Sequence, residues 1–351
     1  MLVSVTGGTG FLGAHTVSSL VGRGHRVRLL ARDERRVEPA LGPLGVDRSA
    51  VEVVVGDVTD EAAVGRLVRG ADAVLHAASV YSFDSRRRAS MRRTNERGTE
   101  VVLGAARRLG ADPVVHVSTF GVLEPDGGRR VRADAPVGRP RECYLSTKAA
   151  AERIARRHRS RGAPVVITYP AALLGPDDPK LGDQTARLRN ALRGLMPIWP
   201  LGGFPVGDVR DAAAFHADLF DAPGRGAERL LVPGRHMSTR EYVATLRQVT
   251  GRRLPTVFLP ARAVVPVGLL TDAVQRVWPW HIPAEYGAVH VSGRDLRVDV
   301  GPGPRPVTET FGDTVRWLHR AGLLSARQAG RAAEPPSRAL QERREQGKVR
   351  R

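Results

Sequence analysis

A tyrosine and a lysine stand four residues apart, at Tyr144 and Lys148, in a stretch rich in helix-forming residues. Residues four apart lie on one face of a helix, so both side chains would point into the same space. An ammonium group there would favour the phenolate and lower the pKa of Tyr144 toward a value useful for acid–base chemistry. Because the chain has only 5 tyrosines and, by count, 3 lysines, a chance pairing explains this spacing poorly. We interpret Tyr144 as a proton donor.

Two hydroxyl side chains, Ser118 and Thr119, follow a predicted strand at 113–117. Doubly wound sheets bind their ligands at the carboxyl ends of the strands. A hydroxyl at this position could hold a substrate carbonyl beside the tyrosine. Both residues are candidates, and a hydroxyl that only caps the chain after the strand is the alternative.

A glycine-rich turn, TGGTGFLG at 6–13, joins a predicted strand at 2–5 to a predicted helix at 11–22. In this spacing Gly7 permits a tight turn, Gly10 lets the backbone approach a pyrophosphate, and Gly13 allows close packing of helix and sheet. The turn therefore predicts a bound dinucleotide, against the alternative of a glycine-rich turn without a ligand. The other predicted cofactor contacts in the turn are Thr9, Phe11 and Leu12.

The second predicted strand, 26–30, is followed by Arg32, where an arginine accommodates the 2′-phosphate of NADP and an acidic residue selects NAD. The sequence favours NADP, and Asp33 as the next residue keeps NAD open. After the third strand, Asp57 could accept from an adenine amino group or cap the helix that begins at Glu61. Three further positions are predicted to border the cofactor: Val58, Ala77 and Ala78.

Short β-branched runs alternate with helical stretches through the first half of the chain, which predicts a parallel sheet covered by helices on both faces. The predicted strands are 2–5, 26–30, 51–55, 73–76 and 113–117, and the helices between them are 11–22, 61–69 and 95–109. We expect an α/β protein with a doubly wound parallel sheet (Rossmann type) and a smaller, irregular C-terminal substrate domain. The expected division is 1–172 with a returning segment 211–235 for the dinucleotide, 173–210 and 236–324 for the substrate, and 325–351 as a flexible basic tail.

The composition argues against several classes of function. The 351 residues carry a formal net charge of +19, but only 3 of the 55 basic residues are lysine, and the arginines are spread over nearly every segment. With 5% aromatic residues the chain offers few stacking platforms, so we expect no nucleic-acid partner. The longest apolar runs are too short for an integral membrane span. A single cysteine and a first strand that leads directly into glycines favour a cytoplasmic protein, and no metal-ligand pattern is apparent.

Several motifs in this order resemble the extended short-chain dehydrogenase/reductase family, within the NAD-dependent epimerase/dehydratase superfamily: TGGTGFLG, GDVTD at 56–60, LHAAS at 75–79, NERGT at 95–99, the strand-end Ser-Thr and YLSTK. The resemblance implies that Thr119 fills the Ser/Thr position, that Tyr144 is the acid/base, and that Lys148 binds the nicotinamide ribose and tunes the tyrosine. It gives Asn95 a structural role in its helix. Hydride would pass between nicotinamide and a carbonyl or alcohol carbon.

Two departures point away from nucleotide sugars: the Asn that sugar epimerases carry is missing from 168–176, and Arg32 stands where an acidic residue is usual. The pattern is more similar to dihydroflavonol-4-reductase-like and 3β-hydroxysteroid-dehydrogenase-like members. This implies an NADP-dependent oxidoreductase for a bulky, largely apolar small molecule, with Pro170 against the nicotinamide. A nucleotide-sugar epimerase or dehydratase and a non-catalytic NADP-sensing regulator are the alternatives, and a homodimer stays open. The predicted pocket walls are Tyr81, Phe83, Leu173, Met196, Trp199 and Phe204.

Overall fold

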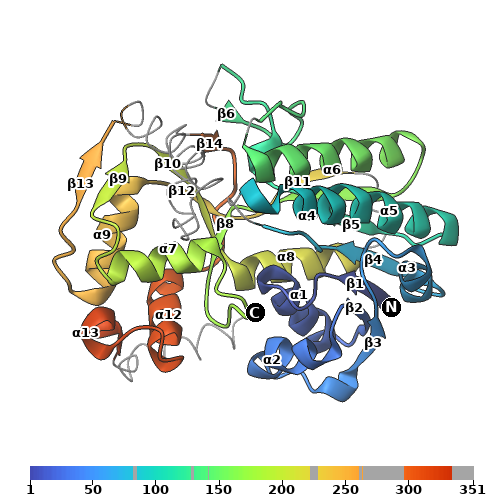
Figure 1. Ribbon diagram of the computed structural model, residues 1–351, viewed down its shortest axis with the longest axis horizontal. Coiled ribbons are helices and arrows are strands. Elements are labelled where there is room, and N and C mark those ends of the chain that lie inside the picture. The colour runs from blue at the N-terminus through green and yellow to red at the C-terminus, as the bar shows by residue number, and fades with distance from the viewer. Residues whose placement is uncertain are drawn as a thin grey trace.

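The computed structural model describes residues 1–81, 85–127, 130–140, 142–221, 228–260, 263 and 296–333. Phe83 and the part of the predicted tail after residue 333 lie outside the described residues. Two regions can be followed in Figure 1: a sheet with helices on both faces, and a group of shorter strands and helices beside it.

Seven parallel strands form the main sheet in the order β3-β2-β1-β4-β5-β7-β11. β1 and β4 are neighbours, and later strands are added outward from β1 on one side and from β4 on the other. This order confirms the predicted doubly wound α/β fold. The strands are rich in valine and leucine because both sheet faces are covered by helices. Their bounds are β1 Leu2–Thr6, β2 Arg26–Ala31, β3 Val51–Val55, β4 Ala73–His76, β5 Val114–Val117, β7 Val165–Tyr169 and β11 Arg229–Leu231.

Two helical layers cover this sheet (Figure 1). On one face, α1 (Phe11–Gly22) and α8 (Val209–Asp221) pack into a core that includes Leu20 and Phe220. On the other face lie α3 (Glu61–Val68), α5 (Gly98–Leu109) and α6 (Cys143–Ser160), around a core that includes Leu67 and Val102. Shorter elements complete this region: η1 Glu34–Arg36, α2 Val37–Leu41, η2 Gly42–Leu44, η3 Arg48–Ala50, η4 Ser85–Arg87, α4 Arg88–Arg92, a π-turn η5 Arg93–Arg97, and η6 Phe120–Val122.

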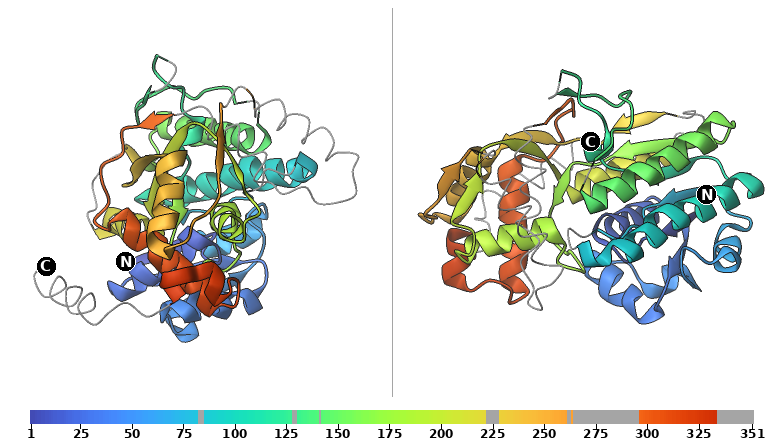
Figure 2. Two further views of the ribbon diagram at one scale, coloured as in Figure 1. Left: turned by 90° about the vertical axis from the view of Figure 1, so that its left-hand side faces the viewer. Right: turned by 45° about the horizontal axis from the view of Figure 1, so that its top comes forward.

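The second region has its own core, built around Tyr242, Leu246 and Phe311. Figure 2 shows its helices beside the short strands. The strands are β8 Ala172–Leu174, β10 Gly203–Asp208 and β12 Arg235–Ser238 in one sheet, and β9 Ile198–Pro200 with β13 Val257–Leu259. A further pair, β6 Arg130–Val131 with β14 Arg297–Val298, packs through Val131 and Val298 into the core of the first region that includes Leu67 and Val102. The helices are α7 Asp183–Leu192, α9 Thr239–Thr250 and α12 Val307–Arg320.

The chain beyond residue 324 differs from the sequence prediction. Residues 325–333 were expected to belong to a flexible tail, but α13 (Ala326–Ala329) and η8 (Gly330–Ala333) are helical. Ser325 and Gln328 form a reciprocal capping box that starts α13. Ala329 and Ala332 are buried in the third core. Small apolar side chains at these positions are enough to hold the segment although it has no large ones.

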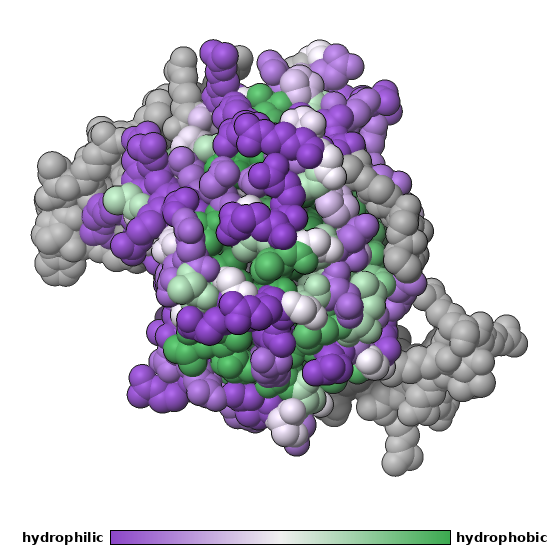
Figure 3. Space-filling model, turned by 90° about the vertical axis from the view of Figure 1, so that its right-hand side faces the viewer, coloured by the Kyte–Doolittle hydropathy of each residue, from purple (hydrophilic) through white to green (hydrophobic). Residues whose placement is uncertain are grey.

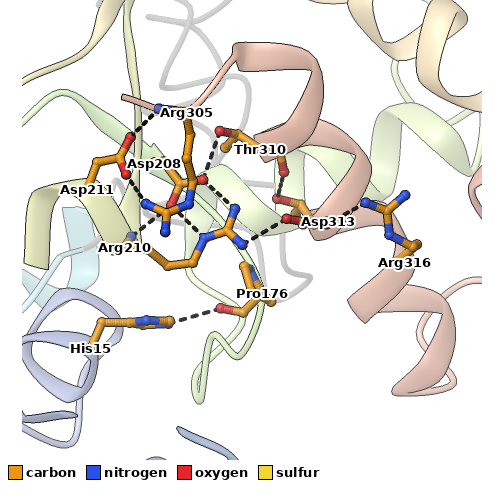
Figure 4. Close-up of polar contacts among 10 residues, drawn as sticks. His15, Pro176, Asp208, Arg210, Asp211, Arg305, Thr310, Asp313 and Arg316 are labelled. Carbon is orange, nitrogen blue, oxygen red and sulfur yellow. Dashed lines mark hydrogen bonds and ion pairs between the residues drawn. The ribbon is translucent and has the colours of Figure 1, made fainter. Parts of the chain in front are cut away.

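An ion-pair network holds the second region to the start of α8 (Figure 4). The Arg210 guanidinium donates to Asp208 at 2.7 Å and to Asp313 on α12 at 2.8 Å. Arg305 forms a separate ion pair with Asp211, which follows Arg210 in α8. Because the carboxylates of Asp208, Asp211 and Asp313 are largely buried, each needs such a partner.

Hydrophilic side chains are distributed over the face that lies on the right of Figure 1, with apolar groups between them (Figure 3). Among the described residues, no helix is both long and apolar enough to cross a bilayer.

Candidate active site

A cleft of about 580 Å³ opens between the two regions and takes walls from both. It brings together residues that are far apart in the sequence, from the glycine turn, the end of β2, the end of β5, α6 and the segment after β7. The predicted site residues that border it are Gly7, Gly10, Phe11, Leu12, Gly13, Arg32, Ala77, Thr119, Tyr144, Lys148 and Pro170. The predicted residues Thr9, Asp57, Val58 and Ala78 are not among those that border it.

The glycine turn has the geometry of a phosphate cradle. Gly7 has a φ of 81°, and a Cβ on it would lie 2.5 Å from the backbone nitrogen of Ala78. A Cβ on Gly13 would lie 2.2 Å from the Gly7 oxygen, so helix and turn could not approach as closely with any other residue. Gly10 is the N-cap of α1, and no side chain caps that end. The amides of the first turn therefore remain available for an anionic group, which fits a dinucleotide diphosphate.

The end of β2 offers cationic rather than acidic groups to the cleft. Arg32 borders it, and so does Arg36, which the sequence analysis did not select. The Asp33 carboxylate caps η1 and accepts from Nε of Arg35 at 3.1 Å. That carboxylate is thus engaged locally, which weakens the argument for NAD that its position suggested.

Two residues after the third strand lie differently from the predictions. The Asp57 carboxylate accepts from the backbone nitrogen of Thr59 at 3.0 Å and from its hydroxyl at 2.7 Å, whereas the cap of α3 is Asp60. The proposed helix cap at Asp57 is therefore wrong. Val58 is buried in the core, packs against Gly98 and does not border the cleft.

The start of α6 positions the tyrosine and the lysine. Glu142 is the N-cap and accepts from the backbone nitrogens of Tyr144 and Leu145, both at 2.7 Å. Lys148 lies one turn further along, is buried, and donates from Nζ to the Val117 carbonyl at 2.8 Å. The helix thus places both side chains in the cleft wall and ties the lysine to the end of β5.

The electrostatics of the pair differ from the sequence prediction. Burial, followed by the nearby Tyr81, Glu142 and Asp183, holds the pKa of Tyr144 well above its usual value. The predicted lowering by Lys148 is therefore wrong for the structure as it stands: burial is the largest cause of the raised pKa, the carboxylates of Glu142 and Asp183 act in the same direction, and the ammonium is bound to the Val117 carbonyl. Burial also lowers the pKa of Lys148 to about 8. The phenol is protonated at neutral pH, which suits a proton donor.

Both candidate hydroxyls border the cleft. Thr119 is the N-cap of η6, and its hydroxyl accepts from the backbone nitrogen of Gly121 at 3.4 Å. The Ser118 hydroxyl is buried and has no hydrogen-bond partner among the described residues. A buried hydroxyl without a partner is costly unless a ligand or water satisfies it, so Ser118 is as strong a candidate as Thr119.

Asn95 connects the segment after β4 to α6. Its side-chain oxygen accepts from the backbone nitrogen of Val80 at 2.8 Å and from the Ser79 hydroxyl at 3.1 Å. Its side-chain nitrogen donates to the Thr147 hydroxyl at 3.0 Å. Asn95 is buried, and its hydrogen bonds fix Ser79 and Val80 against α6.

The substrate side of the cleft has apolar and polar parts. Of the predicted walls, Tyr81, Leu173 and Phe204 border it, whereas Trp199 and Met196 pack in the third core. Sequence reasoning missed the residues that the loop after β8 and the start of α7 contribute: Asp178, Lys180, Leu181, Asp183, Gln184 and Arg187. The rarity of lysine was the one signal that could have singled out Lys180.

Comparison with known proteins agrees with this geometry. Residues 3–229 match the model of the NAD dependent epimerase/dehydratase family. The chain belongs to this family. It is an enzyme of the extended short-chain dehydrogenase/reductase type, and its Rossmann domain is the NAD-binding unit of the family.

Two curated relatives and one solved structure are similar to this chain over most of its length. "Sterol demethylase protein B" of Methylococcus capsulatus is 30% identical over 92% of this chain and 100% of its own length. A 4-hydroxy-2-methyl-3-oxo-4-farnesyl-3,4-dihydroquinoline-1-oxide ketoreductase of Stigmatella aurantiaca is 29% identical over 95% and 98%. The solved dTDP-glucose 4,6-dehydratase of Streptomyces venezuelae, which contains NAD, superposes with a TM-score of 0.70 at 23% identity, over 93% of this chain and 100% of its own.

Proposed function

We propose that this enzyme is an NADP-dependent oxidoreductase that interconverts a carbonyl and an alcohol on a bulky, largely apolar small molecule. One observation carries the proposal: Tyr144, Lys148 and the uncapped glycine turn border the same cleft. A proton donor and a dinucleotide cradle are thereby placed at one site, as a reduction by nicotinamide requires.

The residues that would hold the cofactor follow from the cleft wall. The turn of Gly7, Gly10 and Gly13 would take the diphosphate, and Arg32 with Arg36 the 2′-phosphate. Lys148 would bind the nicotinamide ribose, and Pro170 would lie against the ring. When bound, the reduced nicotinamide supplies the hydride that the reaction needs.

Tyr144 would donate the proton to the developing alkoxide oxygen of the substrate. Its pKa lies well above the usual value because of burial, so the phenol carries its proton throughout the neutral range. Ser118 or Thr119 would orient the carbonyl by donating a hydrogen bond to its oxygen. In the oxidation of an alcohol, the raised pKa would oppose loss of the proton from the tyrosine, so the free enzyme is better suited to reduction.

The substrate class is supported by the apolar and aromatic residues that border the cleft. Tyr81, Leu173 and Phe204 are among them. Two relatives whose names refer to a sterol and to a farnesylated ketone support the same class. We therefore infer a hydrophobic ketone as the physiological substrate of the reduction.

A second candidate is a nucleotide-sugar epimerase or dehydratase, because the start of α7 adds polar groups, Asp183, Gln184 and Arg187, to the same cleft. The two candidates differ in their use of cofactor: an epimerase returns its NAD to the starting state, whereas a reductase consumes reduced cofactor.

Titration of the enzyme with NADPH and NADH, followed by a panel of hydrophobic ketones with loss of reduced nicotinamide as the signal, tests the proposal. We expect tighter binding of NADPH and net oxidation with at least one ketone. Conversion of a UDP-sugar without net change in nicotinamide would favour the epimerase instead.

A further inference from the structure

Three cationic side chains from two separate parts of the chain meet at the cofactor end of the cleft. Arg32 and Arg36 follow β2, and Lys180 lies in the loop between β8 and α7. The Nζ atom of Lys180 is 4.0 Å from the position that a Cβ on Gly10 would occupy. Gly10 is the residue at which the backbone of the glycine turn approaches a diphosphate. The lysine therefore lies next to the Gly10 end of the anion cradle, although it comes from the loop between β8 and α7.

Contacts at the start of the loop fix it to the helix that the glycine turn begins. Nε2 of His15, on α1, donates to the Pro176 carbonyl at 3.1 Å, as Figure 4 shows. Burial lowers the pKa of His15 to about 4, so the ring is neutral and this contact persists at physiological pH. A Cβ on Gly175 would lie 3.6 Å from the ring of Phe11, so the loop also packs closely on α1.

A buried carboxylate fixes the turn that carries the lysine. Asp178 accepts from the backbone nitrogens of Lys180 at 3.2 Å and Gly182 at 2.9 Å, and from the Thr185 hydroxyl at 2.7 Å. Its two oxygens are thus used on the turn and on the first part of α7. Leu181, next to the lysine, has a φ of 46°, a conformation that a leucine adopts only where such contacts impose it.

The charge balance at this point favours an anion. Burial, Arg32 and Arg36, in that order, lower the pKa of Lys180, and Asp178 acts in the opposite direction. The positive charges of Lys180, Arg32 and Arg36 repel one another. A phosphate group placed among them would relieve this repulsion. A diphosphate over the α1 N-terminus would lie within reach of Lys180.

We propose that Lys180 is a cofactor ligand that binds the diphosphate of the dinucleotide from the substrate-binding region, opposite the glycine turn, while Arg32 and Arg36 take the 2′-phosphate. This inference rests on the proposed cofactor site. It has a consequence for the substrate, since the loop of Lys180 continues directly into the wall formed by Asp183, Gln184 and Arg187. The bound diphosphate would hold that wall in place, so the cofactor should bind before the substrate.

The test is a comparison of Lys180→Met with the full-length parent, with dissociation constants for NADPH and NADH measured by nicotinamide fluorescence. Because both dinucleotides carry the diphosphate, we expect the variant to lose affinity for each by the same factor, about tenfold or more. Lys180→Arg should retain most of the affinity. Arg193→Met is the matched control, because it removes one positive charge from an exposed position at the end of α7, outside the cleft wall.

The outcomes separate this inference from the proposed function. A loss confined to NADPH would move Lys180 to the 2′-phosphate and overturn the assignment to the diphosphate. Unchanged affinity for both dinucleotides, or an equal loss in Arg193→Met, would also overturn it. If the parent itself binds neither dinucleotide, the proposed function fails, and the inference fails with it.

Discussion

The ring of Tyr81 meets the ring of Tyr144 edge to face, with centroids 4.6 Å apart and planes at 88°. Tyr81 also accepts a hydrogen bond at its hydroxyl from Gln184 of α7, at 3.3 Å. Such ring pairs are worth about 0.5 to 1.5 kcal/mol beyond the area they bury. The side chain proposed to donate the proton is therefore oriented by a ring that also contacts α7 of the second region.

Replacement of Tyr81 should separate these two contacts. Tyr81→Phe keeps the ring and removes the hydroxyl with its hydrogen bond to Gln184, so kcat for ketone reduction should stay within about twofold. Tyr81→Leu removes the ring pair and should lower kcat about tenfold, because Tyr144 is then held less well. The NADPH dissociation constant should be unchanged in both. Equal kcat values for the two variants would show that the ring does not position Tyr144.

Cofactor preference depends on the cationic groups after β2. Arg32→Ala should weaken NADPH binding about tenfold and leave NADH binding within about twofold, because only NADPH carries the 2′-phosphate. Arg35→Ala is the control: Arg35 is two residues from Asp33, pairs with it, and is not among the residues that border the cleft. An unchanged NADPH/NADH ratio in Arg32→Ala, measured by fluorescence titration, would contradict the assignment.

The pH dependence follows from Lys148, whose pKa burial lowers to about 8. The ammonium is present below this pH and is lost as the pH rises through it. We therefore expect kcat/KM for NADPH, which reports the free enzyme, to fall above about pH 8. Lys148→Arg keeps a positive charge at all accessible pH values, so kcat/KM for NADPH should no longer fall above about pH 8. The different shape of arginine will lower the rate at every pH. If kcat/KM falls at the same pH in the parent and in Lys148→Arg, a group other than Lys148 is responsible for the titration.

Replacement of Asn95 should lower the stability of the protein. Asn95→Ala removes the acceptor of the Val80 amide and one of the two partners of the Thr147 hydroxyl, which keeps its hydrogen bond to the Tyr144 carbonyl. An unsatisfied buried group costs about 1 to 3 kcal/mol, so the free energy of unfolding should fall by about 2 kcal/mol or more. Denaturant unfolding followed by circular dichroism measures this change. A loss below about 0.5 kcal/mol would mean that water replaces the side chain.

The fold and the cofactor end of the cleft could be predicted because their signals are local. The glycine spacing, the β-branched runs and Arg32 each act through neighbours in the sequence, and the helical spacing of Tyr144 and Lys148 correctly places both in one wall. These features predict a parallel sheet and a helix without any knowledge of long-range contacts.

What sequence reasoning missed depends on residues brought together by folding. The pKa of Tyr144 is set by burial and by groups such as Tyr81 and Asp183, which are remote along the chain. Lys180 lies in a Pro- and Gly-rich loop without periodicity, and its meaning appears only when His15 and Asp178 fix that loop over the glycine turn. The packing of 325–333 was missed because its alanines have little individual hydrophobic signal.

The proton-donor role of Tyr144 is tested most directly by the kcat of ketone reduction in Tyr144→Phe, with NADPH as reductant and NADPH binding measured in parallel. Loss of a positioned general acid should lower kcat about a hundredfold or more while the NADPH dissociation constant stays within about twofold. A variant that binds NADPH normally and reduces the same ketone at the parent rate would contradict the account.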